Sequence, residues 1–199
     1  MKILECEQRS TEWFEARLGC ITGSNMSKVI TASGKPSTQI DTHINELIAQ
    51  RLIGEIPQQD EPNFWMQRGT ELEPQARMFY ELAQDVEVKE VGFCKHDILN
   101  CGVSPDGLVG DDGGLEIKCP RESTQIKYLR SGKLPAEYKP QVMACLWITR
   151  REWWDFLSFH PKLPEFQIRV YRDEEYISSL QQQVTKACET IENEVRKLQ

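Results

Sequence analysis

Residues 102–119 read GVSPDGLVGDDGGLEIKC, and the expected fold can be worked out from this stretch. Two strand-like runs, 101–109 and 115–119, flank a cluster of aspartates and glycines at 111–114. Asp-Gly and Gly-Gly pairs between such runs are typical of a β-hairpin turn. The sequence therefore predicts an antiparallel hairpin in the middle of the chain.

This hairpin would bring two carboxylates and one ammonium group together. Asp106 lies five residues before Asp111 and Glu116 lies five after it, so a loop centred there sets the two acids opposite each other, with Cβ atoms roughly 4.5–5.5 Å apart. Lys118 is two residues beyond Glu116 and points to the same face. Like charges this close are costly unless a cation lies between them, and Mg²⁺ prefers oxygen ligands. We therefore expect a metal site made of both carboxylates and the Ile117 carbonyl, with Lys118 serving the attacking water or the developing phosphorane charge.

The same Glu-x-Lys triplet also has an ordinary structural explanation. An isolated Glu116-x-Lys118 is common on surface hairpins, where the two side chains form a solvated pair worth little. The segment Ser104-Pro105-Asp106-Gly107, placed to pair with the triplet, favours the metal site instead.

Periodic patterns on both sides of the hairpin predict the remaining elements. Helices are expected over 12–18, 25–30, 41–53, 70–83, 124–130, 137–147 and 173–198. Strands are expected over 86–94, 101–109, 115–119, 153–159 and 166–171. A Pro- and Gln-rich connector occupies 57–62. This order predicts an α/β (α+β) domain in which helices flank a central mixed β-sheet.

Composition narrows the class of protein. The 199 residues, 39% hydrophobic and 28% charged, suit one compact globular domain. No apolar run approaches 18 residues, and the first residues lack a signal-peptide core, so we expect a cytoplasmic protein without membrane contact. The net charge of −7 lowers the expectation of a nucleic-acid partner without excluding one, because metal ligands are acidic and basic residues can be confined to one concave surface.

Cysteine and histidine spacing argues against several metal centres. The seven cysteines are scattered and never spaced as CxxC, and the three histidines are equally dispersed. We therefore expect reduced thiols, and neither a disulfide framework, a zinc ribbon, an iron–sulfur cluster nor a local histidine site.

Other polar residues have two interpretations each. Glu73 is a further acidic candidate, but Thr70-x-x-Glu73 also fits a capping box. Arg17, with Ser24 expected at a helix N-cap, could anchor a phosphate or be a surface arginine and a plain cap. Gln141 could face the site or be a partly buried amide.

Five segments in order resemble the λ-exonuclease (YqaJ-like viral recombinase) branch of the PD-(D/E)xK nuclease superfamily. They are residues 13–24, 68–73, 102–107, 115–120 and 141–143, and they span about residues 10–150. The resemblance implies a restriction-endonuclease-like core. We therefore expect one nuclease domain over 1–199, with a motif-bearing core over about 10–172 and a C-terminal helix over 173–198.

The resemblance also implies an activity. Such proteins are Mg²⁺-dependent 5′-to-3′ exonucleases that digest one strand of linear double-stranded DNA to mononucleotides, leaving 3′ overhangs for single-strand-annealing recombination. It implies two Mg²⁺ ions, for which Mn²⁺ can substitute, a homotrimeric ring around DNA and a single-strand annealing protein as partner. The setting would be the cytoplasm of a bacterium or a phage-infected cell.

Residue roles carried over by motif agree with the hairpin geometry. The metal has the same ligands, Lys118 serves the nucleophilic water, Glu73 looks like the helix carboxylate that supports the metal, and Gln141 looks like the downstream helix residue of the pocket. In the same way, the group that holds a terminal 5′-phosphate corresponds to Arg17, Ser24 and Ser104.

A strand-separating wedge is a further expectation from the resemblance. Trp65-Met66, just before Arg68, falls where the family uses an apolar wedge to part the duplex, so Met66 is expected to contact DNA.

Two other functions remain open. The chain could be a structure-specific DNA endonuclease or resolvase on the same core, which would cut covalently closed DNA. It could also be a catalytically silent DNA-binding assembly module, although an inactive site has no physical reason to keep close like charges.

Overall fold

The computed structural model describes residues 1–56 and 64–199, apart from the side chain of Met66. The connector predicted over 57–62 lies outside these residues. The helices are α1 (Thr11–Arg17), α2 (Ile40–Ile53), α3 (Phe64–Gln84), α4 (Glu122–Ser131), α5 (Lys139–Thr149) and α6 (Glu174–Leu198), with the 3-10 helices η1 (Gly23–Lys28) and η2 (Ala136–Tyr138). Across the described part of the chain, none of them combines the length and apolar character needed to cross a membrane.

Most helix predictions are confirmed, and two boundaries are wrong. The helix expected from Thr70 begins at Phe64, so Thr70 lies inside α3 and the capping-box interpretation fails. Gly69 and the Thr-x-x-Glu pattern imitate a helix start because both also occur within helices. Ser24 lies inside η1, and the cap position before it belongs to Thr22.

The described strands form two sheets. One is five-stranded, ordered β3 (Val88–Lys89), β6 (Gly107–Val109), β7 (Gly113–Lys118), β8 (Trp153–Ser158) and β9 (Phe166–Tyr171). The other is four-stranded, ordered β1 (Lys2–Leu4), β4 (Phe93–Lys95), β5 (Cys101–Val103) and β2 (Ile21–Thr22). In the larger sheet β7 and β8 are parallel and the other neighbours antiparallel, so the predicted mixed sheet is confirmed.

The sequence predicted one mixed sheet, and the structure has a second sheet beside it. The runs expected as strands over 86–94 and 101–109 are each broken, and each gives one short strand to either sheet. The second break falls at Ser104-Pro105-Asp106, where Pro105 has no N–H to continue a ladder. This break separates Asp106 from β5 and leaves it directly before β6.

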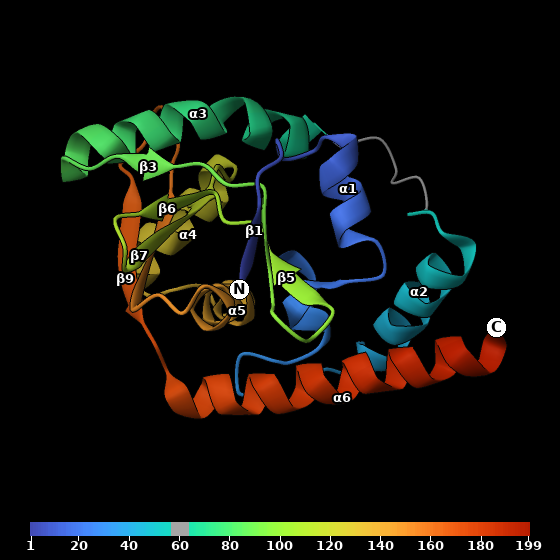
Figure 1. The fold of residues 1–199 in the computed structure, drawn as a ribbon. Coiled ribbons are helices and arrows are strands. Elements are labelled where there is room, and N and C mark those ends of the chain that lie inside the picture. Colours follow the sequence, from blue (N-terminus) through green and yellow to red (C-terminus); the bar gives the residue numbers. More distant parts are fainter. Residues whose placement is uncertain (57–63) are drawn as a thin grey trace.

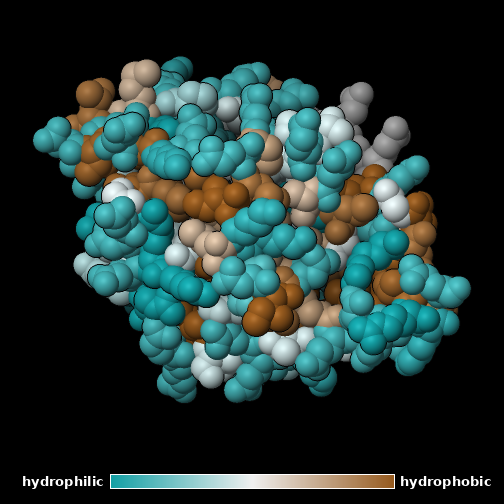
Figure 2. All heavy atoms as spheres, viewed as in Figure 1, coloured by the Kyte–Doolittle hydropathy of each residue, from teal (hydrophilic) through white to brown (hydrophobic). Residues whose placement is uncertain are grey.

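Helices cover both faces of the larger sheet (Figure 1). α3 packs on one face, where Ala76 and Tyr80 share a core with Leu115 and Leu157. α5 lies between the sheets and is almost entirely buried, and it contacts η1, α6 and β8. α6 packs against α2, and its apolar residues belong to the same core as those of α5. Hydrophilic side chains cover most of the face shown in Figure 2, and hydrophobic ones gather in a band beneath α3.

Close packing requires glycine at the beginning of β7. Gly113 and Gly114 were expected in the turn, but they are the first two residues of β7 and pair with Trp153 and Trp154 of β8. A Cβ on Gly114 would lie 2.2 Å from the Trp154 ring, and one on Gly113 would lie 2.0 Å from the Trp153 ring. Any larger residue would therefore force β7 and β8 apart.

Candidate active site

The β6–β7 hairpin has the predicted register. Its paired residues are Gly107 with Leu115, Leu108 with Gly114 and Val109 with Gly113, so the hairpin is centred on Asp111. One further step in this register sets Asp106 across from Glu116. Asp106 lies just outside β6, and its carboxylate Oδ2 accepts a hydrogen bond from the backbone N–H of Ile117 at 2.6 Å.

Glu116 is the most enclosed acid of the site, with a side chain only 1% exposed. Its Oε1 accepts hydrogen bonds from Gln141 Nε2, at 2.6 Å, and from Lys118 Nζ. Its Oε2 is buried without a hydrogen-bond partner among the described residues. A buried carboxylate oxygen in this state is unusual and calls for a cation or water.

Burial and the neighbouring charges shift the pKa values of all three hairpin groups. Burial raises the pKa of Glu116 to about 7, and the charges of Asp106 and Glu73 push it the same way. Burial also raises the pKa of Asp106. Burial alone would lower the pKa of Lys118, but the charges of Glu116 and Asp106 outweigh it and raise that pKa. The hairpin therefore sets two acids against one ammonium group, and burial favours the uncharged form of both acids.

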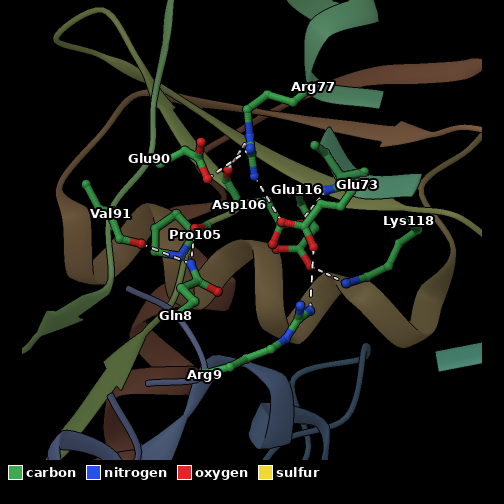
Figure 3. A network of polar contacts seen from close by, with 11 residues as sticks. Gln8, Arg9, Glu73, Arg77, Glu90, Val91, Pro105, Asp106, Glu116 and Lys118 are labelled. Carbon is green, nitrogen blue, oxygen red and sulfur yellow. Dashed lines mark hydrogen bonds and ion pairs between the residues drawn. The ribbon is translucent and has the colours of Figure 1, made fainter. Parts of the chain in front are cut away.

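A third carboxylate approaches from α3. Glu73 Oε1 accepts a hydrogen bond from Arg77 Nη2 at 3.0 Å, and Oε2 lies 3.7 Å from Arg9 Nη2 (Figure 3). Burial, followed by the charge of Asp106, raises the pKa of Glu73. Glu73 is therefore close enough for its charge to interact with that of the hairpin acids, although it lies on a different element.

The residues present fit a hard divalent cation. Asp106 and Glu116 offer carboxylate oxygens, and the backbone of Ile117 lies between Glu116 and Lys118 in β7. Among the described residues no three His, Cys, Asp or Glu side chains form a metal-holding group by themselves, so backbone carbonyl and water would have to complete the shell. The unpartnered Glu116 Oε2 is the observation that favours a cation here.

A second cluster joins the three residues predicted to anchor phosphate. Arg17 Nη1 donates to Ser104 Oγ at 3.0 Å, and Nη2 donates to Ser24 Oγ at 3.4 Å. Trp13 Nε1 also donates to Ser104 Oγ, at 2.9 Å, and the Arg17 guanidinium lies 3.8 Å from the centre of the Trp13 ring. Burial lowers the pKa of Arg17 to about 10, and no carboxylate from the described residues acts on it. A partly buried guanidinium held by hydroxyls and a ring is suited to an anion.

The predicted strand-separating wedge falls in the first turn of α3. Met66 lies in α3, but its side chain is outside the described residues. Its neighbours Phe64 and Trp65 are 67% and 45% exposed.

Several residues of the site were missed by sequence reasoning. Trp13 and Arg77 each lie four helical positions from a predicted residue, Arg17 and Glu73, so i,i+4 spacing could have indicated them. The ring of Tyr138, whose centre is 5.2 Å from Lys118 Nζ, follows only from the way η2 packs.

Comparisons with known proteins show which sequences and folds this chain is similar to. The model of the YqaJ-like viral recombinase domain matches residues 12–152. The structure of an alkaline exonuclease from Laribacter hongkongensis is similar, with 39% identity, a TM-score of 0.86, and coverage of 95% of this chain and 96% of that one. The same exonuclease in complex with dAMP has a TM-score of 0.85. This likeness confirms the predicted fold class.

Two further proteins are similar to this chain at lower sequence identity. A phage-related exonuclease from Haemophilus somnus has 14% identity and a TM-score of 0.73 over 90% of this chain and 96% of its own, which shows a shared fold alone. The uncharacterized protein R354 of Acanthamoeba polyphaga mimivirus is 28% identical over 171 residues. That match covers 79% of this chain but only 30% of the mimivirus protein, so the chain corresponds to a minor part of it.

Proposed function

Because the chain belongs to the YqaJ-like viral recombinase family, we propose that it is a DNA exonuclease. The observation that carries this proposal is the buried Glu116 opposite the half-buried Asp106, with one Glu116 carboxylate oxygen unpartnered beside Lys118. The alkaline exonuclease at 39% identity, aligned over nearly the whole of both chains, supports the same activity.

We propose Mg²⁺ as the cofactor, as two ions for which Mn²⁺ can substitute. Asp106, Glu116 and the Ile117 carbonyl would hold it. When bound, a divalent ion lowers the pKa of a water molecule and offsets charge on the phosphate under attack.

The protein side chains have separate tasks in this proposal. Lys118 keeps its proton between two acids and so positions the attacking water or balances charge on the phosphate. Gln141 orients Glu116 through the hydrogen bond to Oε1. Glu73, whose pKa is raised by burial, supports the metal site from α3.

The cluster of Arg17, Ser24 and Ser104 would hold the terminal 5′-phosphate. An unphosphorylated end would leave the Arg17 guanidinium without an anion, which gives a physical basis for selecting 5′ ends. Digestion from that end would run 5′ to 3′, release mononucleotides and leave a 3′ overhang. The complex of the related exonuclease with dAMP supports a mononucleotide as product.

The assembly is also a proposal. A homotrimeric ring around DNA would keep the acidic outer surface away from the duplex, and a single-strand annealing protein would take up the overhang in recombination. Met66 would act as the wedge that parts the strands. The setting would be the cytoplasm of a bacterial or phage-infected cell.

One experiment tests the activity. Linear duplex DNA, labelled at either end, is incubated with the protein and Mg²⁺, with and without chelator, beside covalently closed circular DNA. Mononucleotides from the 5′-ended strand, lost with chelator, are expected. Cutting of the closed circle would favour the endonuclease or resolvase, and binding without digestion would favour the silent DNA-binding module.

Two variants locate that activity in the hairpin. Lys118→Ala is expected to lower hydrolysis by a factor on the order of 10² to 10³ while binding to DNA ends survives. Lys127→Ala, which removes an exposed lysine of α4, is the matched control and should digest as the parent does. Undiminished digestion by Lys118→Ala would refute the catalytic role.

A further inference from the structure

Arg9 has a backbone conformation that favours glycine. Its φ is 73°, in the left-handed region that residues other than glycine rarely adopt. Hydrogen bonds made by its two neighbours, Gln8 and Ser10, hold the backbone in this conformation. Gln8 Nε2 donates to the carbonyls of Val91, at 2.9 Å, and Pro105, at 2.8 Å, and Ser10 caps α1. Backbone strain maintained in this way is a reason to look for a function of the side chain.

The Arg9 side chain reaches the acidic site. Its Nη2 lies 3.7 Å from Glu73 Oε2, and the side chain is 55% exposed (Figure 3). A pair this long and this open to water stabilises a protein little. The contact with Glu73 therefore does not account for the strained backbone.

Arg77, on the opposite side of Glu73, differs from Arg9. Arg77 is only 12% exposed and has three acceptors: Glu73 Oε1 at 3.0 Å, the Asp106 carbonyl at 3.3 Å and Glu90 Oε2 at 2.9 Å. Its donors are taken up by the protein. Arg9 retains donors that face solvent, so it is the arginine of this pair that can meet an incoming anion.

Both arginines line a cavity that ends at the active-site acids. The cavity has a volume of about 620 Å³ and lies between the N-terminal segment, α3 and the segment that precedes β4. Its charged lining consists of the acids Glu5, Glu7, Glu73, Glu90 and Asp106 and the arginines Arg9 and Arg77. This size suits a nucleotide unit. The negative charges of the lining would repel a phosphodiester chain unless a cationic side chain offset them.

We propose that Arg9 binds a backbone phosphate of the DNA strand being cut, next to the scissile phosphate, as that strand passes through this cavity. The inference rests on the proposed nuclease function. Arg9 lines the cavity with its guanidinium directed toward Glu73, and a guanidinium can donate two parallel hydrogen bonds to one phosphate.

The decisive variant is Arg9→Gly, because glycine accepts the φ of 73° and the fold is expected to persist. Binding of a 5′-phosphorylated linear duplex with a 3′ overhang is measured by fluorescence anisotropy at several salt concentrations, in a Lys118→Ala background that prevents digestion. Arg9→Gly is expected to weaken binding about tenfold and to reduce the slope of log affinity against log salt by about 0.7–0.9, the value for one phosphate contact. Arg9→Lys should keep most of the slope.

Arg150→Gly is a matched control. Arg150 also has a positive φ, 60°, and is 75% exposed, but it lies at the end of α5 away from Gln141. Its loss should change neither affinity nor slope.

Different outcomes separate this inference from the proposed function. If the parent digests DNA but Arg9→Gly binds with parental affinity and slope, the Arg9 inference alone is wrong. A tighter Mn²⁺ affinity, measured by calorimetry, with unchanged DNA binding would mean that Arg9 merely screens Glu73, and would overturn it too. If the parent binds DNA without digesting it, the proposed catalysis fails, and the Arg9 comparison still decides the contact.

Discussion

Gln141 Nε2 lies 2.6 Å from Glu116 Oε1, so helix α5 sets the orientation of a carboxylate in strand β7. Lys118 holds the same oxygen, and together they leave Oε2 as the unpartnered one. The two residues are 25 positions apart in sequence, and the packing of α5 against β7 decides which oxygen faces the site.

The first prediction concerns this hydrogen bond. Gln141→Leu keeps the volume but removes the donor, so Glu116 loses its fixed orientation. The Mg²⁺ concentration for half-maximal digestion is expected to rise roughly 10- to 100-fold, as for other residues that orient a metal ligand. Gln181→Leu, at an exposed position of α6, is the control and should titrate like the parent. An unchanged Mg²⁺ titration for Gln141→Leu would remove Gln141 from the site.

A second prediction follows from the burial of Glu116. Burial raises its pKa from an ordinary value of 4.5 to about 7, so without metal the folded protein holds this proton more tightly than the unfolded chain. Its contribution to stability is complete below about pH 4.5 and is lost as pH rises through about 7, by an amount on the order of 3 kcal/mol. Urea unfolding in chelator at several pH values measures this effect.

The variant Glu116→Gln isolates that contribution, because the amide does not titrate. Its stability should fall less than that of the parent between pH 5 and pH 8. Parallel stability curves for the two proteins would show that Glu116 ionises normally in the fold.

The third prediction concerns the cluster around Arg17. Arg17→Ala is expected to abolish the preference for 5′-phosphorylated over 5′-hydroxyl ends, because the hydroxyls of Ser24 and Ser104 alone provide no charge. A preference on the order of tenfold or more should fall toward one, measured as the ratio of initial rates on the two ends. Arg17→Lys should retain part of it. A mutant that discriminates as well as the parent would assign the cluster to structure.

The fourth prediction concerns packing beneath the hairpin. Gly114→Ala would place a Cβ 2.2 Å from the Trp154 ring, and overpacking of this kind costs about 1–3 kcal/mol. Urea unfolding should show this loss. Gly69→Ala is the control, because a Cβ there meets nothing within 4 Å and alanine favours a helix. Equal stability of Gly114→Ala and the parent would mean that β7 and β8 can move apart freely.

The hairpin was predictable because its information is local. The spacing of Asp106, Asp111 and Glu116 fixes a register, and a period of two fixes the face of Lys118. Apolar residues spaced three and four positions apart predicted α2 and α6 in the same way. Resemblance to a family, rather than spacing, brought Arg17, Ser24 and Ser104 together.

Features set by tertiary contact were not predictable. The division of the strands into two sheets depends on where the chain crosses at Pro105, and an apolar run does not reveal which sheet it joins. Gly113 and Gly114 looked like turn residues because the rings that need them lie about 40 positions away in the sequence. The direction of Arg9 follows from two bonds of Gln8 to distant carbonyls.

The segment Ser104-Pro105-Asp106 has a mechanical consequence. Its first residue, Ser104, accepts a hydrogen bond from Arg17. Its last residue, Asp106, is one of the two hairpin acids. Since only Pro105 separates them, one short piece of backbone sets the distance between the proposed 5′-phosphate site and the proposed metal site. In the proposed enzyme this fixed distance would determine the length of DNA removed at each turnover, so that the protein would advance along the strand by one constant step.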